Sequence, residues 1–129
     1  MESQMRLPIE YSEIVAAGVA ALRAVSTEVR AAATRQPDAP ELWLVVRDLE
    51  GLAGRLADLD EQEWLDGFGA TFVTGQDLGV LDELLKKGVP LEGASVVSLT
   101  SQQAASLTRL REFLQQYRDR SYDSAEPAA

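Results

Sequence analysis

The sequence predicts an all-α fold, a helical bundle of about five helices, from three observations. Leu and Ala are the commonest residues, with 18 of each among 129, whereas β-branched and aromatic residues are sparse. Apolar residues recur at steps of three and four, and capping patterns precede several of these stretches. We expect helices at roughly 9–35, 39–58, 61–72, 76–87 and 101–119. They form one domain over 9–119, between a polar lead at 1–8 and a flexible tail at 120–129.

The first two predicted helices are long, amphipathic and joined by a short linker. The helix over 9–35 follows Pro8, whose fixed φ suits the first helical position. Before the helix over 39–58, Asp38 as N-cap and Glu41 three residues later predict a capping box. Because both helices have one continuous apolar seam, we expect them to pack as an antiparallel hairpin.

The two shorter predicted helices each begin with a reciprocal cap. Asp60 with Glu63, and Thr74 with Asp77, have the three-residue spacing of a capping box. The sequence Lys-Lys-Gly at 86–88 closes the second of these helices with two cations and a glycine suited to a left-handed conformation. These signals predict both ends of the helix over 76–87.

The last predicted helix, over 101–119, follows Thr100, which caps it together with Gln103. The segment before it, 89–99, contains proline and glycine and predicts a loop. Within that loop, 94–99 could be a short extended stretch. A lone strand needs a partner, and we expect one only from a second chain.

The chain contains no cysteine and no histidine. Disulfides, thiol nucleophiles, imidazole acid–base catalysis and Cys/His zinc sites are therefore excluded. No uncharged apolar run approaches the roughly 18 residues that a bilayer helix needs, and no basic lead precedes a signal-like segment. We expect a cytoplasmic protein that is not an enzyme and uses no cofactor or metal.

The net charge of −9 is concentrated in the middle of the chain. Residues 38–83 contain twelve acidic side chains against two basic ones, Arg47 and Arg55. Binding to a phosphate backbone needs clustered Lys and Arg that displace counterions. We therefore expect a protein partner and no direct contact with nucleic acid or membrane.

Two acidic pairs suggest an enzymatic alternative. Asp38 with Glu41, and Glu63 with Asp66, are spaced so that both carboxylates of a pair share one helical face and could bind Mg²⁺. The spacing resembles that of acidic pairs on successive helices of the all-α nucleoside triphosphate pyrophosphohydrolases, although Asp38 stands where Glu is usual. The resemblance implies a Mg²⁺-dependent hydrolase in which Glu41, Glu63 and Asp66 converge on one concavity.

We favour a non-enzymatic helical interaction or assembly module that forms homo-oligomers, of the adaptor, phage accessory or toxin-neutralising type. The five apolar residues 42–46 cover every side of a helical turn, so this segment needs cover from other elements or a second subunit. Trp43 lies beside the leucine seam and is the best candidate for an exposed anchor. The candidate partner interface consists of Trp43, Val46, Asp48, Glu50, Asp58, Asp66, Asp82 and Glu83.

A second non-enzymatic alternative depends on acidic side chains alone. An inhibitor that imitates nucleic acid would present the six acidic residues of the candidate interface as one exposed surface with phosphate-like spacing.

The remaining aromatic residues of the middle region are expected in the core. They are Trp64, Phe68 and Phe72.

Overall fold

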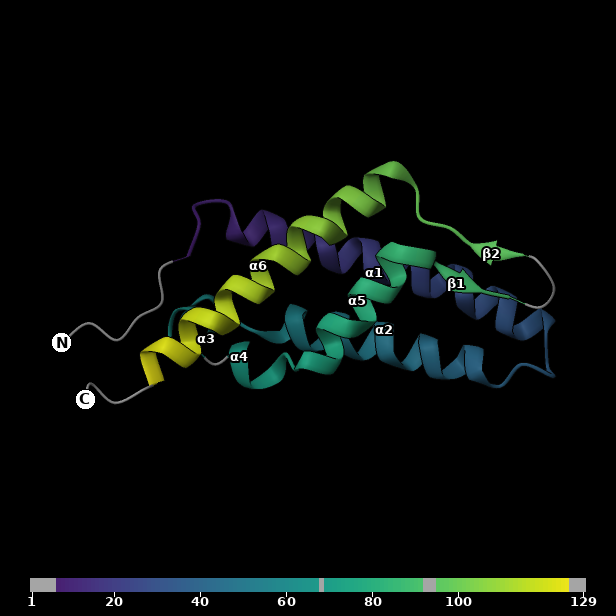
Figure 1. Cartoon of the computed structure of the whole chain (residues 1–129), viewed down its shortest axis with the longest axis horizontal. Helices are drawn as coiled ribbons and strands as arrows, with labels where there is room; N and C mark the ends of the chain where they lie inside the picture. Colours follow the sequence, from purple (N-terminus) through teal and green to yellow (C-terminus); the bar gives the residue numbers. More distant parts are fainter. Residues whose placement is uncertain (1–6, 68, 92–94, 126–129) are drawn as a thin grey trace.

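The computed structural model describes residues 7–67, 69–91 and 95–125, and the fold is all-α (Figure 1). Its elements are α1 (Tyr11–Arg35), α2 (Glu41–Asp58), α3 (Glu61–Leu65), α4 (Gly69–Phe72), α5 (Gly75–Lys87), β1 (Val89–Pro90), β2 (Val96–Val97) and α6 (Ser101–Ala125). The parts of the predicted lead and tail at 1–6 and 126–129 lie outside the described residues. Within the described ranges, no helix combines the length and apolar character needed to cross a bilayer.

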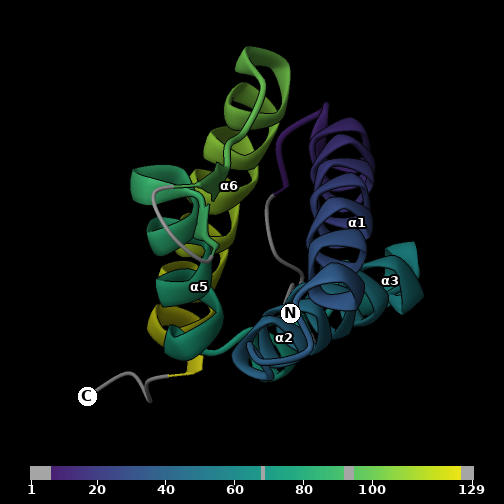
Figure 2. The same cartoon turned by 90° about the vertical axis from the view of Figure 1, so that its right-hand side faces the viewer.

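The helices form two packed pairs. α1 and α2 make the predicted antiparallel hairpin, and α6 packs along α1 while α5 contacts both α6 and α2 (Figure 1). Figure 2, which views the molecule along its long axis, shows α1 beside α2 and α5 beside α6. At Gly18 of α1 a Cβ would lie 2.5 Å from Cδ2 of Leu110 in α6, so the close approach of these helices requires glycine there.

The core consists mainly of leucine and valine, and leucine is the commonest core residue. Burial of one such side chain contributes on the order of 2 kcal/mol, so the seams supply most of the stability of the bundle. The fully buried leucines are Leu22, Leu49, Leu52, Leu56, Leu81, Leu107, Leu110 and Leu114.

An aromatic cluster fastens the short helices to α6. The ring centroid of Trp64 lies 5.5 Å from that of Phe113 and 5.1 Å from that of Tyr117. The Tyr117 hydroxyl donates to the carbonyl oxygen of Trp64 at 2.6 Å, and burial raises the pKa of Tyr117 to about 12. A Cβ at Gly69 would lie 2.8 Å from the Trp64 ring, so only glycine allows the backbone of α4 to pack this close to the ring. Trp64 is thus a core residue, as predicted.

The predicted caps of the two shorter helices are confirmed. At α3 the N–H of Glu63 donates to Oδ1 of Asp60 at 2.8 Å, and the N–H of Asp60 donates to Oε1 of Glu63 at 3.1 Å. At α5 the side chains of Thr74 and Asp77 accept the same reciprocal bonds, at 3.1 and 2.8 Å. Each cap satisfies N–H groups that the first helical turn leaves without partners.

The same cap occurs at the last helix, where the side chains of Thr100 and Gln103 exchange bonds with each other's N–H at 3.1 and 3.0 Å. The predicted closure of α5 is also confirmed. Gly88 has φ 67°, and its N–H donates to the carbonyl oxygen of Leu84 at 2.9 Å. A side chain at Gly88 would be strained at this positive φ.

The first two helices begin at Tyr11 and Glu41, close to the predicted positions 9 and 39, but the predicted capping of the second helix is wrong. Pro8 stands before α1, and its carbonyl oxygen accepts the N–H of Tyr11 at 3.0 Å. No side chain caps α2, so the predicted box with Asp38 is absent. Pro40 already has helical angles of φ −63° and ψ −21°, and its carbonyl accepts the N–H of Trp43 at 3.1 Å. A backbone turn therefore starts α2 in place of the side-chain cap.

Two helix boundaries also differ from prediction. The helix expected over 61–72 is divided into α3 and α4, because Gly67 has φ 85° and ends the first of them. α6 is longer than expected, so residues 120–125 of the predicted flexible tail are helical. Phe68 and the side chain of Phe72 lie outside what the structure describes.

The extended stretch within 94–99 has a strand partner in its own chain. β1 and β2 pair antiparallel, with Val89 opposite Val97. The expectation that only a second chain could supply this partner is wrong. Gly88 has its positive φ directly before β1, and a Cβ there would collide with the carbonyl oxygen of Val97 in β2, so glycine permits this close approach.

Candidate interaction surface

The structure places Val46 in the core, which corrects its inclusion in the candidate interface. Its side chain is 4% exposed and lies on the inner face of α2 with Leu42 and Leu49. The spacing of these residues puts Val46 on the buried side of the helix. The run of apolar residues at 42–46 therefore divides between the core and the surface.

Trp43 and Leu44 are the exposed part of that run, with 43% and 52% of their surfaces accessible. The guanidinium carbon of Arg30 in α1 lies 5.9 Å from the centroid of the Trp43 ring, within range of a cation–π contact. Arg30 is also paired with Glu50, which lies two turns after Trp43 on α2. We call these four residues the Trp43 patch.

The polar side of the Trp43 patch is tied to α1. Glu50 accepts a hydrogen bond from the buried Ser26 hydroxyl at 2.8 Å in addition to the bond from Arg30. Hydrogen bonds from Arg30 and Ser26 lower the pKa of Glu50, so this carboxylate stays ionised. The charged pair orients Arg30 over the indole ring, so the exposed aromatic face is held in place before any partner binds.

A groove of about 680 Å³ lies between α2 and α5 and brings together Asp48, Asp82 and Glu83. Its lining includes apolar side chains of both helices, such as Val45 and Val80. The carboxylates are paired with cations: Asp82 accepts two bonds from Arg111 at 2.8 and 3.1 Å, Glu83 lies 2.9 Å from Lys87, and Asp48 lies 3.3 Å from Arg47. The groove edge is therefore polar but largely neutralised.

The six acidic residues proposed as a nucleic-acid mimic do not form one surface. Asp48 lines the groove against α5, whereas Glu50 faces α1, so the two lie on opposite edges of α2. Asp66 lies beyond the end of α2 and accepts a bond from Gln62 at 2.9 Å, and Asp58 is exposed at the last residue of α2. The arrangement expected of a mimic is therefore wrong.

The convergence expected of a Mg²⁺-dependent hydrolase is also wrong. Glu41 begins α2, whereas Glu63 and Asp66 follow its opposite end. At a rise of about 1.5 Å per residue, the length of α2 separates them by roughly 25 Å. Among the described residues, no three carboxylates are grouped closely enough to hold a metal ion.

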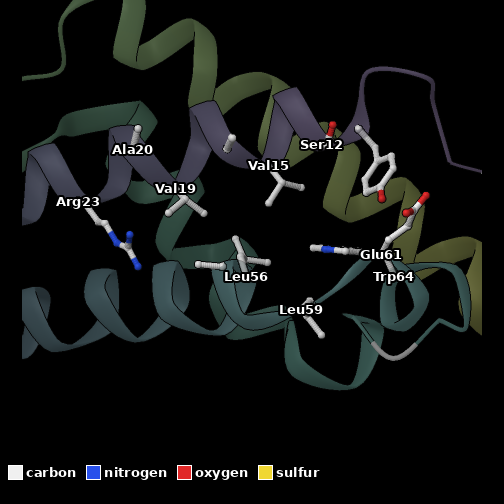
Figure 3. A pocket seen from close by; sticks show the side chains of 12 residues that line it. Ser12, Val15, Val19, Ala20, Arg23, Leu56, Leu59, Glu61 and Trp64 are labelled. Atoms are coloured by element: carbon white, nitrogen blue, oxygen red, sulfur yellow. The ribbon is translucent and has the colours of Figure 1, made fainter.

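A second groove, of about 520 Å³, lies between α1 and the end of α2 with α3 (Figure 3). Val15 and Val19 project from α1 toward Leu56 of α2, and Trp64 and Glu61 close one end. Its walls are mostly aliphatic and aromatic, which suits van der Waals contact more than acid–base chemistry.

The sequence prediction missed the exposure of Leu44 and the character of the neighbouring surface of α2. Arg47 and the glycines Gly51 and Gly54 lie on the same side as Leu44, opposite the buried leucines. A helical wheel of residues 41–58 contains this signal. The chain has no match among protein-family models, curated proteins or solved structures, so its own surface is the basis for a functional proposal.

Proposed function

We propose that this chain is a non-enzymatic helical interaction module that binds a partner protein through the Trp43 patch. The observation that best supports the proposal is the exposure of Trp43 and Leu44 on a helix whose other leucines are buried. Tryptophan is strongly enriched among residues that dominate binding energy, and its loss from such a site typically costs about 2 kcal/mol or more.

The surroundings of Trp43 fit a binding anchor. Arg30 covers part of the ring, and its pairing with Glu50 supplies a polar rim beside the apolar centre. Because α1 and α2 are packed along their length, the patch rests on a rigid support. A partner therefore meets a preformed site and loses little entropy in ordering it.

Site-specific photo-crosslinking tests the proposal. The chain is produced in its native cells with photoreactive p-benzoylphenylalanine in place of Trp43, and separately in place of Arg109, an exposed residue on α6. We expect a crosslinked adduct of discrete mass from position 43 and none from position 109. Equal crosslinking from both positions, or none from position 43, would contradict the proposal.

A further inference from the structure

The surface of α2 opposite its buried leucines, here called the outer face, has an unusual composition. On an ideal helix its residues project within an arc of about 100°. The outer face consists of Trp43, Leu44, Arg47, Gly51, Gly54 and Asp58. It has apolar side chains at its start, Arg47 before the two central glycines, and Asp58 at its end.

The fold itself does not require the two glycines of the outer face. A Cβ at Gly51 or Gly54 would meet no atom within 4 Å, whereas a Cβ at Gly18 would collide with Leu110. A glycine inside a helix costs about 0.5–1 kcal/mol relative to alanine. The space over Gly51 and Gly54 is therefore open to the backbone of a second helix at close range.

The charges of the outer face complement one another when the face meets a copy of itself. Arg47 lies four residues before Gly51, and Asp58 lies four residues after Gly54. A two-fold axis midway between the glycines sets Gly51 opposite the partner's Gly54 in an antiparallel pair of helices. The same axis sets Arg47 opposite the partner's Asp58, and Asp58 opposite the partner's Arg47.

From this symmetry we infer that the occupant of the outer face is a second copy of this chain, bound antiparallel through α2. The inference rests on the proposed function, since it names the partner of the surface that contains Trp43. In the dimer, Trp43 and Leu44 lie at the level of the partner's α2–α3 connection, which contains the partly buried Leu59. Arg47, whose side chain is 72% exposed, gains an ion pair across the interface.

Charge reversal provides the first test, by sedimentation equilibrium of the purified chain at several concentrations. We expect the wild type to dimerise. Arg47→Asp and Asp58→Arg each place like charges opposite one another twice per dimer, so each should weaken dimerisation roughly tenfold. The double variant Arg47→Asp/Asp58→Arg restores opposite charges and should recover most of the affinity. Arg109→Asp on α6 makes the same change in net charge as Arg47→Asp and should leave the dissociation constant unchanged.

Bulk at the glycines provides the second test. Gly51→Leu should abolish the dimer while the monomer stays folded, because its Cβ enters open space. Gly79→Leu is the matched control, since Gly79 is a helix-interior glycine of α5 whose Cβ also meets no atom within 4 Å. The control should dimerise as the wild type does, and circular dichroism should give equal helicity for both variants.

The outcomes separate this inference from the proposed function. A wild type that is monomeric at 100-fold the concentration used for crosslinking, or a dimer that is unaffected by Gly51→Leu and by single charge reversal, overturns the inference. If position 43 then still gives an adduct with a different protein, the proposed function stands without the dimer. An adduct of two copies from position 43, together with rescue in the charge-swapped double variant, supports both.

Discussion

The two faces of α2 differ in the burial of their leucine side chains, although they share one helix. Leu49, Leu52 and Leu56 on the inner face are almost fully buried, whereas Leu44 on the outer face is 52% exposed. Packing of the inner face stabilises the helix, because an isolated segment of this length is marginal in water. The outer face does not contribute to that packing, so its exposed Trp43 and its central glycines support the proposed binding role.

Truncation of a leucine to alanine should change the free energy of unfolding far more on the inner face than on the outer face, and this is the largest difference we expect. Leu52→Ala removes a fully buried side chain and leaves a cavity, so we expect the free energy of unfolding to fall by about 2–5 kcal/mol. Leu44→Ala makes the same chemical change on the outer face and should alter it by no more than about 0.5 kcal/mol. Urea unfolding at one low protein concentration measures both, and equal losses would contradict the division of the helix into two faces.

A smaller loss in the free energy of unfolding is expected at the contact between Arg55 and α5. Arg55 lies at the edge between the two faces of α2. Arg55 donates to both carboxylate oxygens of Asp77 at 2.9 Å, while Asp77 also caps α5. Asp77→Ala should cost about 2 kcal/mol, from a lost cap and a lost charged pair that is only partly shielded from water. Asp60→Ala at the exposed cap of α3 is the control, with an expected cost of about 1 kcal/mol.

The contribution of Asp77 should also depend on pH. Burial raises the pKa of Asp77, but hydrogen bonds from Arg55 and Thr74 together outweigh it, so the net pKa is lowered. A carboxyl with a lowered folded pKa stabilises the fold above its unfolded pKa of about 4 and loses that contribution as the pH falls through the folded value. The stability gap between wild type and Asp77→Asn, measured by urea unfolding, should narrow below about pH 4. A gap that is constant down to pH 2 would refute the ion pair as its source.

The smallest expected effect is an increase in the stability of the monomer. Gly51→Ala should raise the stability of the monomer by about 0.5–1 kcal/mol, because it reduces the entropy of the unfolded chain and its Cβ meets open space. The same substitution at Gly18 should lower stability, since that Cβ collides with Leu110. Thermal unfolding at a concentration where both variants are monomeric tests the pair. A loss of stability from Gly51→Ala would show that the fold needs this glycine.

Local signals predicted a large part of this fold. The caps at Asp60, Thr74 and Thr100 were predictable because each depends on side chains three residues apart within one turn. The same reasoning failed at Asp38, where Pro40 adopts helical angles and a backbone turn starts the helix. The extent of α6 over 120–125 was missed as well, because the composition there is polar and small.

The candidate interface was harder to predict than the helices. Val46 and Trp43 belong to one apolar run, and only the docking of α2 against the rest of the bundle decides which of them is covered. Asp48 and Glu50 are two residues apart, which turns them to opposite edges of the helix, toward α5 and α1. Composition alone could not show that these two carboxylates face different helices, although a helical wheel places them on opposite edges of α2.

The sequence by itself determined the all-α class, the leucine seams and three of the helix starts, because these depend on periodicity and on hydrogen bonds within three or four residues. The tertiary structure decided the rest: the pairing of β1 with β2, the burial of Val46, and the exposure of Trp43 with Arg30 over its ring. The burial of Val46 and the contact of Arg30 with Trp43 depend on how α1, α2 and the rest of the bundle pack against one another, which no local pattern specifies. The two strands pair residues only six and eight positions apart, but each is two residues long, too short for a periodic signal.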